Sequence, residues 1–105
     1  WPVIHEFLAV VTHPRIYSPP TPLDDALLQV RRWMESPSFS AIAEAGPIYF
    51  DYLEHVLGAA RAVGPRVHDA RIIGICLAHG VEEFWSADRD FSRFPGLKVR
   101  NPLVA

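Results

Sequence analysis

The fold is decided by the stretch VEEFWSADRDFSRFPGL, which runs from Val81 to Leu97. Its opening part, Val81 to Trp85, is apolar enough to predict a short buried strand. Asp88 and Asp90 follow this strand directly. Because open α/β sheets bind ligands in the crevice outside the carboxyl ends of their strands, both acids stand where a ligand site is expected.

Two acids in distant segments are placed in a similar way. Glu6 lies in WPVIHEFL at the beginning of the chain, and Asp69 lies in VHDAR. Hard divalent cations such as magnesium need several oxygen donors, which carboxylates from separate segments supply when they converge. Together with Asp88, these residues indicate metal-dependent phosphodiester chemistry.

Apolar spacing and helix-end signals outline the remaining elements. Thr21 is expected to cap the second helix, with Pro22 at its first position, and Asp69 is expected to begin the fourth. The expected helices cover residues 2–12, 22–36, 49–63 and 69–79, and the expected strands cover 39–43, 81–85 and 97–99. Helices that alternate with short apolar strands predict an α/β sandwich with a mostly parallel sheet.

Length and composition limit the possible functions. A chain of 105 residues forms one domain at most, and its apolar half is enough for a packed core. The formal net charge of −2 argues against bulk electrostatic capture of nucleic acid, so any phosphate contacts must be local. The single cysteine, Cys76, fits the reducing cytoplasm, and no apolar run is long enough to span a bilayer.

Several motifs together resemble those of the PIN-domain ribonucleases. The segment EFLAVVTHPR, Glu6 to Arg15, is similar to a helix of that family, and Asp69-Ala70 is similar to its second acidic motif. SADRDF, Ser86 to Phe91, resembles the third, and it is followed by Phe94-Pro95-Gly96-Leu97 and Asn101-Pro102-Leu103. The resemblance covers essentially the whole chain in order and is nearest to the VapC toxins of toxin–antitoxin modules.

This resemblance implies a fold, an activity and partners. The fold is a PIN-like α/β/α sandwich, and the activity is hydrolysis of RNA by an endoribonuclease that uses Mg²⁺ or Mn²⁺. Glu6, Asp69 and Asp88 are the implied metal ligands, and Asp90 is a further catalytic residue. The implied partners are an RNA substrate, a cognate antitoxin bound in an apolar groove between the first two helices, and a second copy in a homodimer.

The chain departs from the family at its beginning. PIN domains open with a strand that ends in an Asp metal ligand, and nothing before Glu6 corresponds to it. We therefore expect residues 1–105 to be the C-terminal part of a single PIN-like domain whose N-terminal strands are absent, and to lack nuclease activity alone. The alternative is a catalytically incomplete PIN-like module that only binds a protein partner.

Each candidate acid also has a purely structural interpretation. Glu6 would then be a partly exposed residue at a helix edge, and Asp69 an N-cap. Asp88 and Asp90 would be turn acids that accept hydrogen bonds from nearby backbone amides. The remaining acids, Glu83 among them, are expected on solvated surfaces.

Overall fold

The computed structural model describes residues 1–94 and 96–103, so Pro95 of the stretch quoted above lies outside it. Its elements in chain order are α1 (Pro2–Val11), α2 (Leu23–Met34), α3 (Pro47–Ala60), α4 (Arg66–Ala78), β1 (Glu83–Trp85), the 3₁₀ helix η1 (Arg89–Arg93) and β2 (Lys98–Arg100). Two units, Trp1–Ala43 and Glu44–Ala105, each pack within themselves. None of the helices in the described part of the chain is long and apolar enough to cross a membrane.

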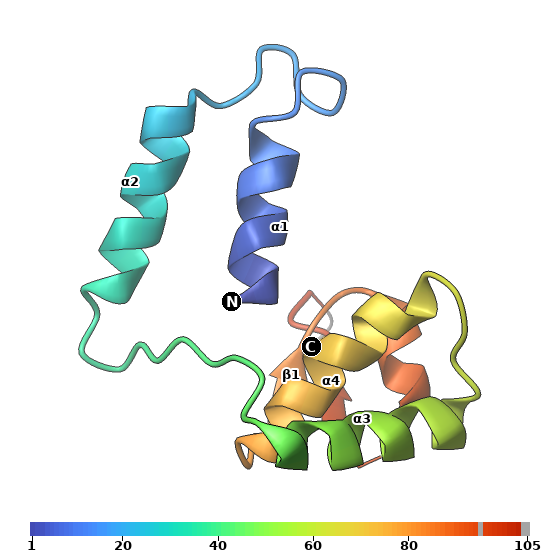
Figure 1. Ribbon diagram of the computed structural model, residues 1–105. Helices are drawn as coiled ribbons and strands as arrows, with labels where there is room; N and C mark the ends of the chain where they lie inside the picture. Colours follow the sequence, from blue (N-terminus) through green and yellow to red (C-terminus); the bar gives the residue numbers. More distant parts are fainter. Residues whose placement is uncertain (95, 104–105) are drawn as a thin grey trace. The chain divides into compact units, whose positions relative to one another are not determined.

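Helices α1 and α2 lie side by side and form the first unit (Figure 1). The rings of Phe7 and Trp33 pack against each other with their centroids 4.8 Å apart. Ala26 and Val30, both on α2, are the buried apolar residues of this unit among those the structure describes. Many other apolar side chains of the pair stay exposed, including Leu27 on α2.

The start of α2 differs from the prediction. Pro22 is the N-cap residue, α2 begins at Leu23, and no side chain caps the helix. Thr21 instead donates its backbone N–H to the carbonyl of Val11, 2.8 Å away, and so ties the loop to the end of α1. Acidic residues in the first turn of α2 and arginines in its last turn complement the helix dipole.

The strand predicted over residues 39–43 is wrong, because the chain has no regular secondary structure there. The carbonyl of Ile42 accepts a hydrogen bond from the amino group of Trp1 at 2.7 Å, which is a single contact and not a ladder. Ala41 and Ala43 within this segment and Glu44 directly after it are poor strand formers. The prediction rested on a short apolar run, which cannot by itself specify a pairing partner.

Helices α3 and α4 pack closely in the second unit (Figure 1). Gly74 of α4 faces α3, where an added Cβ would lie 3.2 Å from Cε1 of Tyr49 and 3.6 Å from the Cα of Leu53. The missing side chain therefore allows the two helices to approach. Val56 of α3 and Ile73 of α4 are fully buried.

The end of α3 comes earlier than the predicted Val63. The helix ends at Ala60 because Arg61 adopts a left-handed conformation, with φ 50° and ψ 43°. The backbone N–H of Ala62 then donates to the carbonyl of Leu57 at 3.0 Å, which closes the helix end. Glycine is the usual residue at such a position, so the sequence did not indicate that the helix ends before Arg61.

The start of α4 also corrects the prediction. Pro65 is its N-cap residue and Arg66 its first residue, so Asp69 neither begins nor caps this helix. Asp69 lies instead in the first turn, where the helix dipole favours a carboxylate. The helix, expected to end at residue 79, ends at Ala78, and Gly80 follows its C-cap residue His79 with a φ of +72°.

Strands β1 and β2 pair in parallel and form a two-stranded sheet. The cross-strand partners are Glu83 and Lys98, Phe84 and Val99, and Trp85 and Arg100. Both strands were predicted; β1 is shorter than expected, and β2 is displaced by one residue. The α/β class is thus confirmed as helices with a small parallel sheet, while η1, which lies in the connection between the strands, was not predicted.

An exposed ion pair joins the start of the second unit to α4. The guanidinium of Arg71 donates to the carboxylate of Glu44, and both side chains are partly exposed to solvent. This hydrogen bond holds the pKa of Glu44 below its ordinary value and raises the pKa of Arg71. Beside the pair, burial and then the charge of Glu44 raise the pKa of Tyr49.

The core of the second unit lies between α3, α4, η1 and the sheet. Its buried apolar residues, among those the structure describes, are Val56, Ala62, Ala70, Ile73, Ile75, Cys76, Phe91, Phe94 and Leu97. Cys76 is 7% exposed, and burial raises the pKa of its thiol. The stretch that predicted the fold therefore supplies three of these core residues.

Candidate active site

The third acidic motif forms a compact turn at the end of β1. The N–H of Ser86 donates to the carbonyl of Arg100 at 2.9 Å, which extends the pairing of β1 with β2 by one bond. The hydroxyl of Ser86 accepts from the N–H of Asp88 at 3.1 Å, and Oδ1 of Asp88 accepts from the N–H of Asp90 at 2.9 Å. Asp88 is thereby the N-cap of η1, and the structural role considered for it is confirmed.

Aromatic residues hold this turn on the core. The ring of Phe91 packs on that of Phe84 with centroids 4.9 Å apart, and Phe94 is 2% exposed. Asp88 and Asp90, in contrast, are both exposed. The motif therefore presents two neighbouring carboxyl groups to solvent from a backbone that its own hydrogen bonds and buried rings fix in place.

Asp69 is positioned by a different element of the same unit. It lies half-buried in the first turn of α4, and α4 contacts η1 directly. The structure thus brings the helix that carries Asp69 against the helix that Asp88 caps. His68, the neighbour of Asp69, is exposed.

Glu6 belongs to the first unit and is exposed on α1. It lies in a shallow hollow whose other lining residues are Val3, Phe7, Val10, Val11 and Tyr17. A charged carboxylate lies there beside apolar side chains. Its exposure keeps it hydrated and so removes the cost of burying an unpaired charge.

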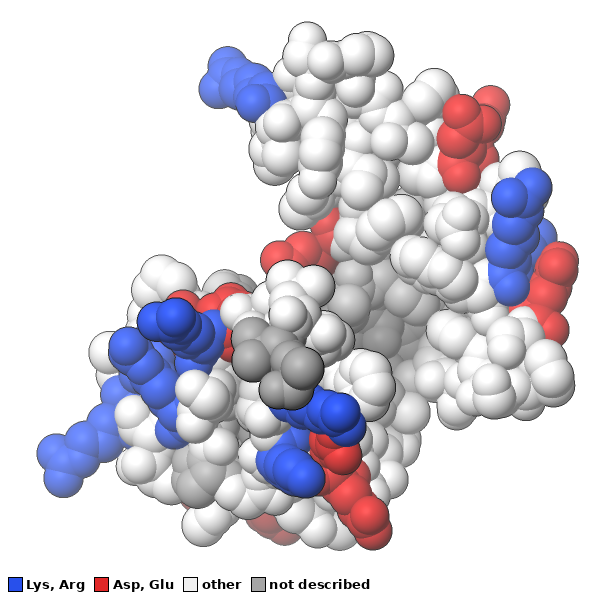
Figure 2. Space-filling model, turned by 180° about the vertical axis from the view of Figure 1, so that it is seen from behind, with Lys and Arg blue, Asp and Glu red and all other residues white. Residues whose placement is uncertain are grey.

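Figure 2 shows basic side chains grouped on the surface of the second unit, with acidic side chains among them. Within residues 1–94 and 96–103, no group of three or more His, Cys, Asp or Glu side chains lies close enough together to hold a metal ion. The metal ligands Glu6, Asp69 and Asp88 therefore stay a prediction. Among the candidate acids, the structure shows a hydrogen bond from the backbone N–H of Asp90 to the carboxylate of Asp88.

One cluster on the sheet was missed from the sequence. The carboxylate of Glu83, expected on a solvated surface, accepts from the indole Nε1 of Trp85 at 2.8 Å and lies 3.6 Å from the guanidinium of Arg100. That guanidinium lies over the Trp85 ring, 5.0 Å from its centroid. The alternation of Glu83 and Trp85 on one strand, opposite Arg100 on the other, is the signal that would have found it.

The sequence as a whole is similar to known ribonucleases. It is 31% identical to Ribonuclease VapC48 of Mycobacterium tuberculosis over 103 residues, which cover 98% of this chain and 70% of that protein. This chain belongs to the VapC ribonuclease family. Ribonuclease VapC33 of the same organism is 33% identical over 106 aligned positions, which cover 98% of this chain and 71% of that protein. No family model matches the sequence.

The resemblance drawn from the motifs is therefore confirmed at the level of the family. The same comparison covers both units of this VapC protein, because it extends over nearly the full chain. Both units therefore lie within the part of the chain that is similar to proteins named as ribonucleases.

Proposed function

We propose that this VapC protein is a metal-dependent endoribonuclease that hydrolyses phosphodiester bonds of RNA and acts as the toxin of a toxin–antitoxin pair. The observation that carries the proposal is the similarity to two named ribonucleases over 98% of the chain. The exposed carboxyl groups of Asp88 and Asp90 at the end of a parallel strand support it. The proposed overall fold is the PIN-like α/β/α sandwich.

The proposed metal is Mg²⁺ or Mn²⁺, and the proposed ligands are Glu6, Asp69 and Asp88. The donor chemistry fits, because exposed or half-exposed carboxylates are the hard oxygen ligands that these cations prefer. When bound, such a cation polarises the scissile phosphate and lowers the pKa of the attacking water.

The chain's own residues prepare this site in a definite way. The N–H of Asp90 holds Oδ1 of Asp88 at 2.9 Å and so fixes the orientation of that carboxylate. Ser86 fixes the turn from the other side through the N–H of Asp88. Asp90 itself, exposed beside Asp88, is the proposed additional carboxylate that positions substrate or water.

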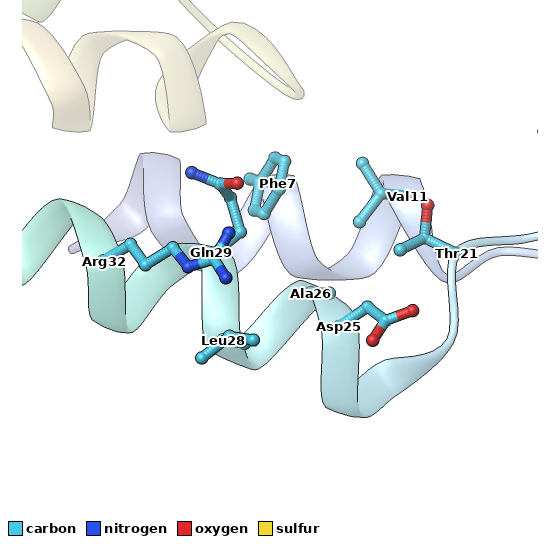
Figure 3. Close-up of a pocket in the computed structure, with 8 residues that line it drawn as sticks. All are labelled: Phe7, Val11, Thr21, Asp25, Ala26, Leu28, Gln29 and Arg32. Atoms are coloured by element: carbon cyan, nitrogen blue, oxygen red, sulfur yellow. The ribbon is translucent and has the colours of Figure 1, made fainter.

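A cognate antitoxin is the proposed protein partner, and its proposed site is the groove between α1 and α2 (Figure 3). Phe7 and Val11 line this groove from α1, and Ala26 and Leu28 line it from α2. Burial of such apolar side chains gives about 25 cal/mol per Å², which suits an amphipathic segment of a partner. An arginine of that segment would pair with Glu6, which is exposed in the adjoining hollow of α1.

We also propose that the protein forms a homodimer and acts in the cytoplasm.

The deciding experiment measures cleavage of a labelled RNA by the full-length protein. We expect cleavage with Mg²⁺ or Mn²⁺ and none with excess EDTA. The metal should also raise the melting temperature of the protein, because a ligand of the folded state stabilises it by mass action. Lack of both effects in pure, folded protein would favour the alternative of a protein-binding module without catalysis.

A further inference from the structure

We propose that Trp85 is a stacking surface for a base of single-stranded RNA beside the active site. This inference rests on the proposed ribonuclease function and assigns a substrate-binding residue to it. The proposal rests on a cluster on the parallel sheet, in which the carboxylate of Glu83 holds both the exposed indole of Trp85 and the guanidinium of Arg100.

The indole is exposed and yet held in one orientation. Trp85 is 60% exposed, although a tryptophan normally gains stability by burial. Its Nε1 donates to Glu83 at 2.8 Å, and the guanidinium of Arg100 lies over its ring. Glu83 also lies 3.6 Å from that guanidinium, so a single carboxylate positions both groups. A flat aromatic surface that is fixed before binding loses little conformational entropy when a base stacks on it.

The basic residues on and around β2 suit a phosphate backbone, and the acid next to the indole, Glu83, is paired with Arg100. Between residues 91 and 103 the charged residues are Arg93, Lys98 and Arg100, and all of them are basic. Lys98 and Arg100 are two residues apart on β2 and therefore share one face of the sheet. Single-stranded nucleic acid is typically bound by aromatic side chains that stack on bases next to cations that contact phosphates.

The position of the indole is close to the proposed chemistry. Trp85 ends β1, and three residues later the chain reaches Asp88, a span of at most about 10 Å. The hydrogen bond from Ser86 to the carbonyl of Arg100 and the bond from Asp88 to Ser86 make this connection rigid. A base stacked on Trp85 would therefore be held at a fixed distance from Asp88 and Asp90, the carboxylates proposed to take part in cleavage of the RNA backbone.

The first test is RNA binding in EDTA, where no cleavage interferes. The probe is a fluorescein-labelled single-stranded RNA of about 12 nucleotides, and the protein is the full-length chain. We expect Trp85→Ala to weaken the Kd about ten-fold, and Trp85→Phe, which keeps an aromatic face, to stay within about three-fold of wild type. The matched control is Phe50→Ala on α3, which removes an aromatic ring that is 58% exposed and should leave the Kd unchanged.

The second test examines the ring itself. Residues 1–105 contain three tryptophans, so Trp1→Phe/Trp33→Phe leaves Trp85 as the sole tryptophan of this stretch, and any tryptophan elsewhere in the full-length protein is also replaced by phenylalanine. Acrylamide should quench its fluorescence in the free protein, and the same RNA should both quench the emission and protect the ring from acrylamide. A ring that acrylamide cannot reach in the free protein is covered by another part of the protein or by a second copy, and this result would overturn the proposal.

The outcomes separate this inference from the proposed function. If wild type cleaves RNA and Trp85→Ala binds the probe as tightly as wild type, the stacking role is refuted and the ribonuclease stands. If wild type binds the probe through Trp85 but never cleaves RNA with metal, the stacking role stands and the ribonuclease falls. If wild type neither binds nor cleaves RNA, both are refuted.

Discussion

At the scale of single residues, Asp88 combines a structural contact with a proposed catalytic one. Its Oδ1 caps η1 through the N–H of Asp90, and its side chain remains exposed to solvent. The two roles are compatible, because a carboxylate has two oxygens and several lone pairs. They also respond differently to substitution, which makes them separable.

We expect Asp88→Asn to abolish RNA cleavage while leaving the protein about as stable as wild type. Asparagine keeps an Oδ1 that accepts the bond from Asp90 but lacks the charge that a metal ion requires. Cleavage assays with Mg²⁺ and thermal melts in EDTA measure the two effects. The control is Asp51→Asn on α3, an exposed acid outside the proposed site, which should retain full activity.

The variant Asp88→Ala completes this comparison, because it loses the cap as well. It should lower the free energy of unfolding by about 0.5–2 kcal/mol, the range for loss of an N-cap. If Asp88→Asn cuts RNA at the wild-type rate, the carboxylate has only the structural role.

The pair of Glu44 and Arg71 gives a prediction for pH dependence. Arg71 lowers the folded-state pKa of Glu44 from its ordinary value of 4.5, so the pair stabilises the fold at neutral pH, and this stabilisation is lost as the pH falls through that lowered pKa. Glu44→Gln should therefore reduce the free energy of unfolding by less than about 1 kcal/mol at pH 7. Urea unfolding at pH 7 and at acidic pH measures this difference, which should vanish in acid. A difference in unfolding free energy of the same size at both pH values would show that the charge of Glu44 is irrelevant. The control is Glu54→Gln on α3, which changes an exposed glutamate outside this pair.

At the scale of elements, the contact between α3 and α4 depends on a residue without a side chain. Gly74 leaves room for the ring of Tyr49, whereas Gly58 of α3 has nothing within 4 Å of where its Cβ would be. Both glycines lie inside helices, so both incur the entropic cost of glycine in a helix. Only one of them has a packing reason to be glycine.

We expect the two glycines to respond in opposite directions to substitution. Gly58→Ala should raise the free energy of unfolding by about 0.5–1 kcal/mol, because alanine is the better helix former. Gly74→Val should lower it by about 1–3 kcal/mol, because the added atoms must displace Tyr49 or separate the helices. Chemical denaturation of both variants measures this. Equal effects of the two substitutions would show that the helices do not meet at Gly74.

Sequence patterns predicted the existence of most elements and failed mainly at their ends. All four helices and the two strands around SADRDF were expected, because their apolar spacing is periodic. The left-handed Arg61 and the N-cap Pro65 were not expected, because neither residue is the usual one at its position. The strand over residues 39–43 failed for another reason, since a strand is defined by a partner that local sequence does not specify.

The candidate site shows the same division. The placement of Asp88 and Asp90 at the end of a strand was predictable, because it follows from where β1 stops. The bond between Asp90 and Asp88 followed from turn chemistry. The cluster of Glu83, Trp85 and Arg100 was missed, because it depends on the register between two strands that are not adjacent in sequence.

At the scale of the whole molecule, the two units differ in how much apolar surface they bury. Helix α1 has no buried residue, whereas α4 has five. Since burial of apolar surface is the main source of stability, the first unit should open more readily than the second.

Amide hydrogen exchange of the full-length protein in the absence of partners should show this difference. We expect the amides of α1 to exchange fastest among the helices and those of α4 to exchange slowest. Addition of the cognate antitoxin should slow exchange in α1 and α2, where we place its groove, and leave α4 nearly unchanged. Protection that appears in α4 alone would place the antitoxin elsewhere.

The burial of Cys76 has a practical consequence for following the protein in solution. Only a thiolate reacts quickly with a disulfide reagent, and burial both hides this sulfur and disfavours its ionised form. Because residues 1–105 contain no other cysteine, colour that such a reagent releases from this stretch comes from this one atom alone. The labelling rate therefore reports how often the second unit opens far enough to expose α4, without any engineered probe.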